Sequence, residues 1–199
     1  VSLQYEDYEV FFRPVKAAYS RVEAGSSAAA VIYRDIYPDI DFEYIACNDF
    51  LKENIIINKY SGINSFSFLI QSPKLIPKLR DNEVYFLDQQ GEGIFFIPAP
   101  YMYDKANEES LDFTVSLEHQ SGPNYILTYT ADEAWLTDPA RVYPVVIDPV
   151  VWTKQSSSDI YDAYVEDSHK YSNFRFEPYL KSGYGSSRGK TRSYIKFRN

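Results

Sequence analysis

The acidic cluster best suited to chemistry lies in "RDIYPDID", residues 34–41. If this segment is a strand, Asp39 and Asp41 face the same side, about 6–7 Å apart. Carboxylates at that spacing suit a calcium site or the paired acids of glycoside hydrolysis. The "YPD" step is also an ordinary turn, because proline fixes φ and aspartate hydrogen-bonds its own backbone. We favour the turn and keep Asp35, Asp39 and Asp41 as a calcium candidate, with no other cofactor expected.

The groups that nucleophilic catalysis needs are sparse. His119 and His169 are the only histidines, and neither has a serine or cysteine motif beside it. Cys47 is the only cysteine, which excludes an intrachain disulfide and a cysteine-rich zinc site. "GYGSSRGK" lacks the spacing of a phosphate-binding loop and is typical of a hairpin tip. We therefore expect that the chain is not an enzyme.

Aromatic residues offer a second kind of site, because sugars stack on exposed aromatic rings. The chain has 19 Tyr, 13 Phe and 2 Trp, and most of them alternate with polar residues, as the core residues of strands do. Five tyrosines near the C-terminal end are candidates for glycan binding, although a core role competes for them: Tyr161, Tyr164, Tyr171, Tyr179 and Tyr184.

The elements that would position these residues are strands, because nearly every periodic stretch has period two. In "DFTVSLEH", residues 112–119, apolar and polar side chains alternate. Turn signals recur at a spacing of roughly 8–12 residues, which is typical of a sandwich or barrel. We predict an all-β chain, with a sandwich-like antiparallel domain followed by a partial β-sandwich module. The clearest hairpin pairs residues 113–118 with residues 125–130.

A single short helix is expected at residues 131–137. Thr130 lies three residues before Glu133, which is the spacing of a reciprocal capping box. Trp135 and Leu136 should pack beneath this helix.

"RVYPVVIDP", residues 141–149, has the pattern of a strand that contains a proline, which favours a sheet edge or a bulge. We interpret it as the last strand of a first unit, because a polar, serine-rich stretch and a change of charge follow it. Residues 1–153 contain 11 Lys/Arg and 23 Asp/Glu, whereas residues 154–199 contain 9 and 5. The predicted division is a domain at residues 1–152, a linker at 153–158 and a β-module at 159–199.

The module at residues 159–199 offers about three strands, too few to be stable alone. We expect it to pack on the first unit or on a second copy of the chain, giving a homodimer. The formal net charge of −8 argues against binding to nucleic acid or to an anionic membrane surface. No apolar run approaches the roughly 18 residues of a membrane span, so no membrane insertion is expected.

Several segments in order resemble the region ahead of the repeats in bacterial Rhs/YD-repeat proteins of the wall-associated type. They are "VIYRDIYPDIDFEYIACNDFLKENIIIN", "FSFLI", "FFIPAPYMYD" and "EAWLTDPARVYPVVIDPVV". The motifs "IPAPYMYD" and "RVYPVVIDP" carry most of this resemblance. The following residues resemble the start of a DNRLRE-type module, through Asp162–Val165, Leu180–Gly183 and Arg192–Phe197. The usual Asn-Tyr-Gly between them is replaced by "SNFRFEP".

The resemblance implies a secreted protein at the bacterial cell wall or surface, whose YD-repeat shell and toxin lie in the rest of its polypeptide. We expect this chain to be a non-enzymatic structural module that serves toxin delivery. A carbohydrate-binding module for cell-wall or target polysaccharide is the alternative, and a polysaccharide hydrolase is the third hypothesis. "TRSYIKFRN" ends within a strand-like alternation, which favours a fragment of a longer protein.

Overall fold

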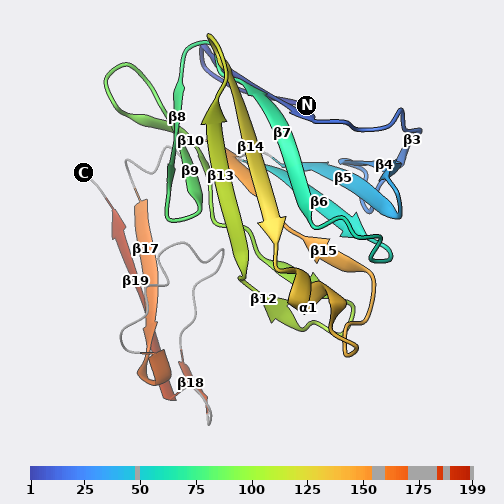
Figure 1. The fold of residues 1–199 in the computed structure, drawn as a ribbon. Helices are drawn as coiled ribbons and strands as arrows, with labels where there is room; N and C mark the ends of the chain where they lie inside the picture. Colours follow the sequence, from blue (N-terminus) through green and yellow to red (C-terminus); the bar gives the residue numbers. More distant parts are fainter. Residues whose placement is uncertain (48–49, 154–159, 170–182, 186–188, 198–199) are drawn as a thin grey trace. The chain divides into compact units, whose positions relative to one another are not determined.

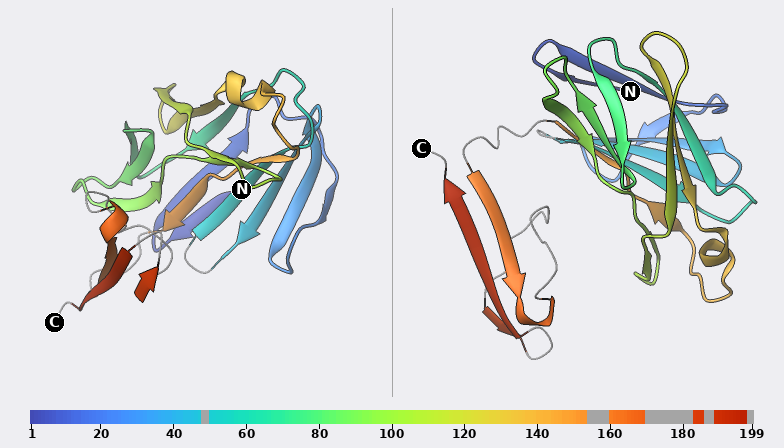
Figure 2. Two further views of the ribbon diagram at one scale, coloured as in Figure 1. Left: turned by 90° about the horizontal axis from the view of Figure 1, so that it is seen from below. Right: turned by 60° about the vertical axis from the view of Figure 1, so that its left-hand side comes forward.

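The computed structural model describes residues 1–47, 50–153, 160–169, 183–185 and 189–197 (Figure 1). The chain divides into two compact units, Val1–Lys154 and Gln155–Asn199. Unit 1 is an all-β, sandwich-like antiparallel domain, as the alternating pattern predicts. Figure 2 shows its layers from two further directions.

The first sheet of unit 1 has five antiparallel strands. In spatial order they are β1 (Ser2–Tyr5), β2 (Tyr8–Pro14), β7 (Ser65–Gln71), β14 (Asn124–Ala131) and β13 (Phe113–His119). β13 and β14 form the predicted hairpin, with Phe113 opposite Ala131 and His119 opposite Tyr125. That prediction is confirmed.

The second sheet is built around β6 (Phe50–Ile57). On one side of β6 lie β5 (Ile40–Ala46), β4 (Ala30–Tyr37) and β3 (Val22–Ala24). On its other side lie β15 (Val145–Ile147) and β16 (Val150–Thr153). β15 continues to β11 (Met102–Asp104) and β12 (Glu109–Ser110), whereas β16 continues to β10 (Gly93–Ile97), β9 (Glu83–Leu87) and β8 (Ile76–Arg80).

The core of unit 1 lies between the two sheets. Alternate residues of each strand face inward, because successive side chains of a strand point to opposite faces. Phe42 of β5 lies 6.3 Å from Phe66 and 5.9 Å from Phe68 of β7, measured between ring centroids. Phe12 of β2 meets Phe86 of β9 edge-on at 6.1 Å. These contacts across the layers make the sandwich a single core.

The segment "RVYPVVIDP" lies in the middle of the second sheet, so the edge position that its prolines predict is wrong. β15 and β16 follow one another along β6 in one register. Pro144 precedes β15, and Pro149 separates β15 from β16. The Pro149 carbonyl accepts a hydrogen bond from the Glu53 N–H at 3.1 Å. The sheet thus lacks one donor at Pro149, and β16, not "RVYPVVIDP", is the last strand of unit 1.

The one α-helix among the described residues is α1 (Glu133–Thr137). Its N-cap is Asp132, whose carboxylate accepts a hydrogen bond from the Trp135 N–H at 3.0 Å. The predicted capping box of Thr130 and Glu133 is therefore wrong, because β14 extends through Ala131 and the helix begins two residues later. Leu136 is buried, as expected. Within the described part of the chain, no helix is long and apolar enough to cross a membrane.

Unit 2 contains a three-stranded antiparallel sheet in its described part. Its order is β17 (Ile160–Glu166), β19 (Gly189–Phe197) and β18 (Gly183–Gly185), and the 3₁₀-helix η1 (Asp167–His169) follows β17. Gly189 has φ of 72°, and a Cβ there would lie 2.7 Å from the Asp167 Cβ. The Asp167 carboxylate also accepts a hydrogen bond from the Lys190 N–H. Packing of this module on unit 1 or on a second copy stays a prediction.

Candidate functional site

The predicted calcium residues surround the turn between β4 and β5. Asp39 lies in the turn itself, with φ of 60°, so it shares no strand face with Asp41. Asp41 is 3% exposed and accepts hydrogen bonds from Arg34 Nη1, the Asp35 N–H and Asn58 Nδ2, at 2.8, 2.8 and 3.0 Å. Burial would raise the pKa of Asp41, but these donors hold it below its ordinary value. Asp41 therefore stabilises the turn between β4 and β5.

A metal role for this cluster stays a prediction. Among the residues that the structure describes, no three His, Cys, Asp or Glu side chains lie close enough to hold a metal ion. The glycan candidates also stay predictions. Tyr184 of β18 is 79% exposed, Tyr161 and Tyr164 belong to β17, and Tyr171 and Tyr179 lie outside the described residues.

The two motifs that carry the resemblance meet in the structure, at β11 and β15. Asp104, the last residue of "IPAPYMYD", is 1% exposed and pairs with Arg141, the first residue of "RVYPVVIDP". The Asp104 carboxylate also accepts hydrogen bonds from the backbone N–H groups of Ala106, Glu108 and Val142. Burial would raise the pKa of Asp104, but these N–H groups and the Arg141 charge lower it.

Arg141 has a second contact that ties this pair to the helix. Its guanidinium carbon lies 4.1 Å from the centre of the Trp135 ring, in a cation–π contact. The predicted packing role of Trp135 is confirmed, because its ring also packs against the core. The two motifs are recognisable in the sequence, but their alternation of apolar and polar residues does not show that Asp104 and Arg141 contact each other.

A second buried carboxylate links the same two motifs. Asp148 is 4% exposed and accepts hydrogen bonds from the Tyr101 hydroxyl at 2.8 Å and from Lys52 Nζ at 2.6 Å. Burial and the Asp148 carboxylate raise the pKa of Tyr101, so its hydroxyl stays a donor. Tyr101 stacks on Tyr103, with ring centroids 6.0 Å apart.

A third carboxylate holds the turn between β3 and β4 against β5. Glu43 is 5% exposed and accepts hydrogen bonds from the Ser26 N–H at 2.6 Å and from Asn54 Nδ2 at 3.0 Å. Burial would raise the pKa of Glu43, but these donors and Lys52 lower it. Gly25 is required here, because a Cβ would lie 2.6 Å from the Ala30 Cβ and 2.9 Å from Glu43 Oε1.

The four carboxylates Asp41, Glu43, Asp104 and Asp148 have one arrangement in common. Each is almost fully buried, and each bonds to donors from another segment of unit 1. Such donors replace part of the water that a buried carboxylate loses, and at Asp41, Glu43 and Asp104 they hold the pKa below its ordinary value. These hydrogen bonds join segments that are distant in sequence into one rigid unit, which is a structural role.

Glu53 of β6 differs from these four carboxylates. It lies directly opposite Tyr44 of β5, and both point to the face that carries the core residues Phe42 and Ile55. The residue as a whole is half-buried, but its Oε1 is fully buried and has no hydrogen-bond partner. Burial raises the pKa of Glu53 to about 7. Sequence reasoning missed this residue, because Glu53 precedes three consecutive isoleucines, Ile55–Ile57, and no alternation shows which face of the strand it takes.

The chain is similar to three tRNA nucleases and to one wall-associated protein. It is 31% identical over 183 residues both to the tRNA nuclease WapA of Bacillus subtilis (strain 168) and to the tRNA3(Ser)-specific nuclease WapA of Bacillus spizizenii. Each match covers 85% of this chain but 8% of the relative. A wall-associated protein of Geobacillus stearothermophilus is 24% identical over 118 residues, covering 54% of this chain and 46% of the relative. No protein-family model matches the chain.

At this low identity, the relatives support a cell-wall-associated family of the WapA type. They also overturn two expectations, that the chain is not an enzyme and that it has no nucleic-acid partner, because three relatives are named tRNA nucleases. The physical reason is the difference in length between this chain and its relatives. A charge of −8 describes 199 residues, and it sets no limit on what a protein many times longer binds or cleaves.

Proposed function

We propose that the chain is a structural module of a large, wall-associated tRNA nuclease, and that tRNA is the substrate of the whole protein. The similarity to 8% of the nucleases' length, over 85% of this chain, supports this assignment. In this proposal the protein lies at the surface of a bacterial cell. The partner of the module is then the rest of its own polypeptide, for which the resemblance to Rhs-type proteins suggests a YD-repeat shell.

The observation that carries the structural role is the pairing of Asp104 with Arg141. Both side chains are buried, 0% and 9% exposed, and the bond joins two motifs 37 residues apart. Removing water from both charges is costly, so such a pair is kept where its geometry fixes one arrangement of the chain. Together with the bond from Tyr101 to Asp148, it fixes β11 against β15 at both ends.

The test uses the whole protein that contains this chain, as wild type and as Asp104→Asn. Each is incubated with isolated cell walls and, separately, with tRNA. We expect the wild type to cleave tRNA and to be retained by the walls, and retention of Asp104→Asn to fall as unit 1 unfolds. Arg80→Met is the matched control, because Arg80 and Asp81 form a pair that is 80% and 88% exposed.

Two results would contradict the proposal. Wild-type protein that leaves tRNA intact would remove the nuclease assignment. Walls that retain Asp104→Asn as well as the wild type, while unit 1 is unfolded, would remove the structural role in wall association.

A further inference from the structure

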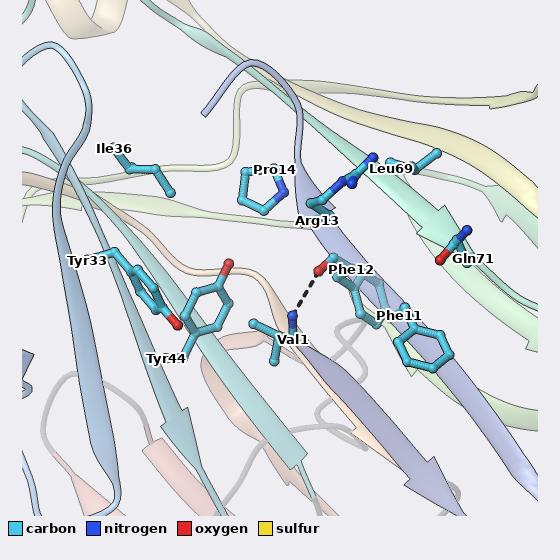
Figure 3. A pocket seen from close by; sticks show the side chains of 10 residues that line it. All are labelled: Val1, Phe11, Phe12, Arg13, Pro14, Tyr33, Ile36, Tyr44, Leu69 and Gln71. Carbon is cyan, nitrogen blue, oxygen red and sulfur yellow. Dashed lines mark hydrogen bonds between the residues drawn. The ribbon is translucent and has the colours of Figure 1, made fainter. Parts of the chain in front are cut away.

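The pocket of unit 1 between β2, β4 and β5 lacks side chains that could react with each other (Figure 3). Figure 3 shows mainly aromatic and aliphatic side chains around it, with Arg13 as the charged one and Gln71 as the amide. Its lining residues, all within the described part of the chain, include no Asp, Glu, Cys or His. Two complementary reactive groups meet elsewhere in unit 1, where Lys52 of β6 contacts Asp148.

The Lys52 amine and the Asp148 carboxylate are in direct contact. Nζ lies 2.6 Å from Oδ2, although the two residues are 96 positions apart in the sequence. Because Oδ2 is bonded to the carboxyl carbon Cγ, the amine is close to the separation of about 3–3.5 Å from which a nucleophile attacks. Asp148 is 4% exposed, and its Oδ1 is buried without a hydrogen-bond partner. This shielding from water favours a condensation, in which water is a product.

Two neighbouring groups can serve the proton transfers of a condensation. The Tyr101 hydroxyl donates to the same Oδ2 at 2.8 Å. Glu43 lies on the same face of the sheet as Lys52, diagonally across β5 and β6. Burial would raise the pKa of Glu43, but its hydrogen-bond donors and the Lys52 charge lower it, so the carboxylate is a proton acceptor near pH 7.

The ring of Tyr103 shows that the three charged groups are gathered in one place. Burial raises the pKa of Tyr103, and the charges of all three groups act on it as well. Lys52, Asp148 and Glu43 therefore lie around one aromatic ring.

We propose that Lys52 and Asp148 condense into an intramolecular isopeptide bond. Glu43 accepts a proton from the Lys52 ammonium, and the neutral Nζ attacks Cγ of Asp148 while the Tyr101 hydroxyl hydrogen-bonds Oδ2. The Nζ–Cγ bond forms and the Cγ–Oδ2 bond breaks. Oδ2 leaves as water with two protons of the ammonium, one of them carried by Glu43. One ammonium and one carboxylate thus become one amide and one water, and no other reactant is needed.

The bond would fix the last two strands of unit 1 to the centre of the second sheet. Asp148 lies between β15 and β16, which both pair with β6, and Lys52 belongs to β6. Tension applied at the C-terminal end of β16 would then stop at Asp148 and leave β15 in the sheet. A covalent bond that closes so long a loop also restrains the unfolded chain. This inference goes beyond the proposed function and does not depend on it.

The test is the intact mass of the folded 199-residue chain after incubation at pH 7.5, measured under denaturing conditions. We expect the mass of the sequence less one water, and a branched peptide after trypsin digestion that joins Lys52 to Asp148. Lys52→Arg keeps the positive charge, but a guanidinium stays protonated and does not condense. This variant should retain the full mass and unfold about 10 °C below the wild type. Lys78→Arg, at an exposed lysine of β8, should lose the water as the wild type does.

Two further variants test the proton route. Tyr101→Phe and Glu43→Gln should each slow bond formation, by about a hundredfold for Glu43→Gln, and circular dichroism verifies that they are folded. The proposal is overturned if the wild type has the full mass of its sequence, if Lys52→Arg also loses a water, or if the branched peptide joins other residues. A folded Glu43→Gln that links as completely as the wild type would overturn the route through Glu43.

Discussion

The guanidinium of Arg141 lies 3.1 Å from the Oδ2 of Asp104, and the two side chains are 9% and 0% exposed. This pair joins the residue that ends "IPAPYMYD" to the residue that begins "RVYPVVIDP". The two motifs that carry the resemblance to wall-associated proteins are therefore two sides of one contact, and their residues are explained by packing in unit 1.

Replacing Asp104 by Asn should destabilise unit 1 by about 3–5 kcal/mol, because it leaves the Arg141 charge buried without a counter-charge. Urea unfolding followed by tryptophan fluorescence measures the change, since Trp135 lies against Arg141. Arg80→Met, in an exposed pair, should change stability by less than about 0.5 kcal/mol. Equal stabilities for the two variants would contradict the role given to Asp104.

Gly25→Ala should destabilise unit 1 by about 1–3 kcal/mol, because the added methyl overlaps Ala30 and the Glu43 carboxylate. Gly93→Ala is the matched control, since its nearest neighbour is Leu87 Cδ2 at 3.9 Å, an ordinary contact. The midpoint of thermal unfolding should fall for the first variant and stay within a few degrees for the second. A similar fall in both would show that the close approach at Gly25 has no special cost.

Much of the fold follows from local pattern, whereas the site depends on partners that are distant in sequence. The hairpin of β13 and β14 is predictable because each strand alternates and a turn separates them. The central position of "RVYPVVIDP" in the second sheet is not predictable in this way. A proline shows only that one backbone N–H donor is missing, and it does not show which strands lie on either side. In the sequence, Glu53 resembles a polar residue at the start of a strand. Only its position opposite Tyr44 shows that its side chain lies on the core face.

The stability of the chain should fall as the pH rises from about 5 to 7. Burial raises the pKa of Glu53 from 4.5 to about 7, so in this range the folded state keeps a proton that the unfolded state has lost. The slope reaches at most about 1.4 kcal/mol per pH unit. Asp41, Glu43 and Asp104 have lowered pKa values and act in the opposite sense, below about pH 4.

Urea unfolding between pH 5 and pH 8 measures this effect, with Glu53→Gln as its control. Glutamine does not titrate, so the variant should lose the slope and exceed the wild type in stability at pH 8. A wild-type stability that is flat or increases from pH 5 to 7, and matches that of Glu53→Gln, would show that Glu53 titrates as an exposed carboxyl does.

Asp132→Ala should destabilise unit 1 by about 0.5–2 kcal/mol, because the Trp135 N–H loses its cap. Thr130→Ala distinguishes this cap from the capping box that the spacing of Thr130 and Glu133 predicts. The Thr130 hydroxyl bonds to Ser65 at an exposed position, so its removal should cost less than the loss of Asp132. Thermal unfolding of both variants measures the order, and the reverse order would restore the capping box.

The most direct test of the structural role is wall retention of the whole protein, plotted against the unfolding free energy of unit 1. The series comprises wild type, Asp104→Asn and Gly25→Ala, with Arg80→Met and Gly93→Ala as controls. We expect retention to fall in the order of lost stability and both controls to match the wild type. Equal retention across the series, while unit 1 is unfolded in Asp104→Asn, would contradict the claim that wall association of the whole protein requires a folded unit 1.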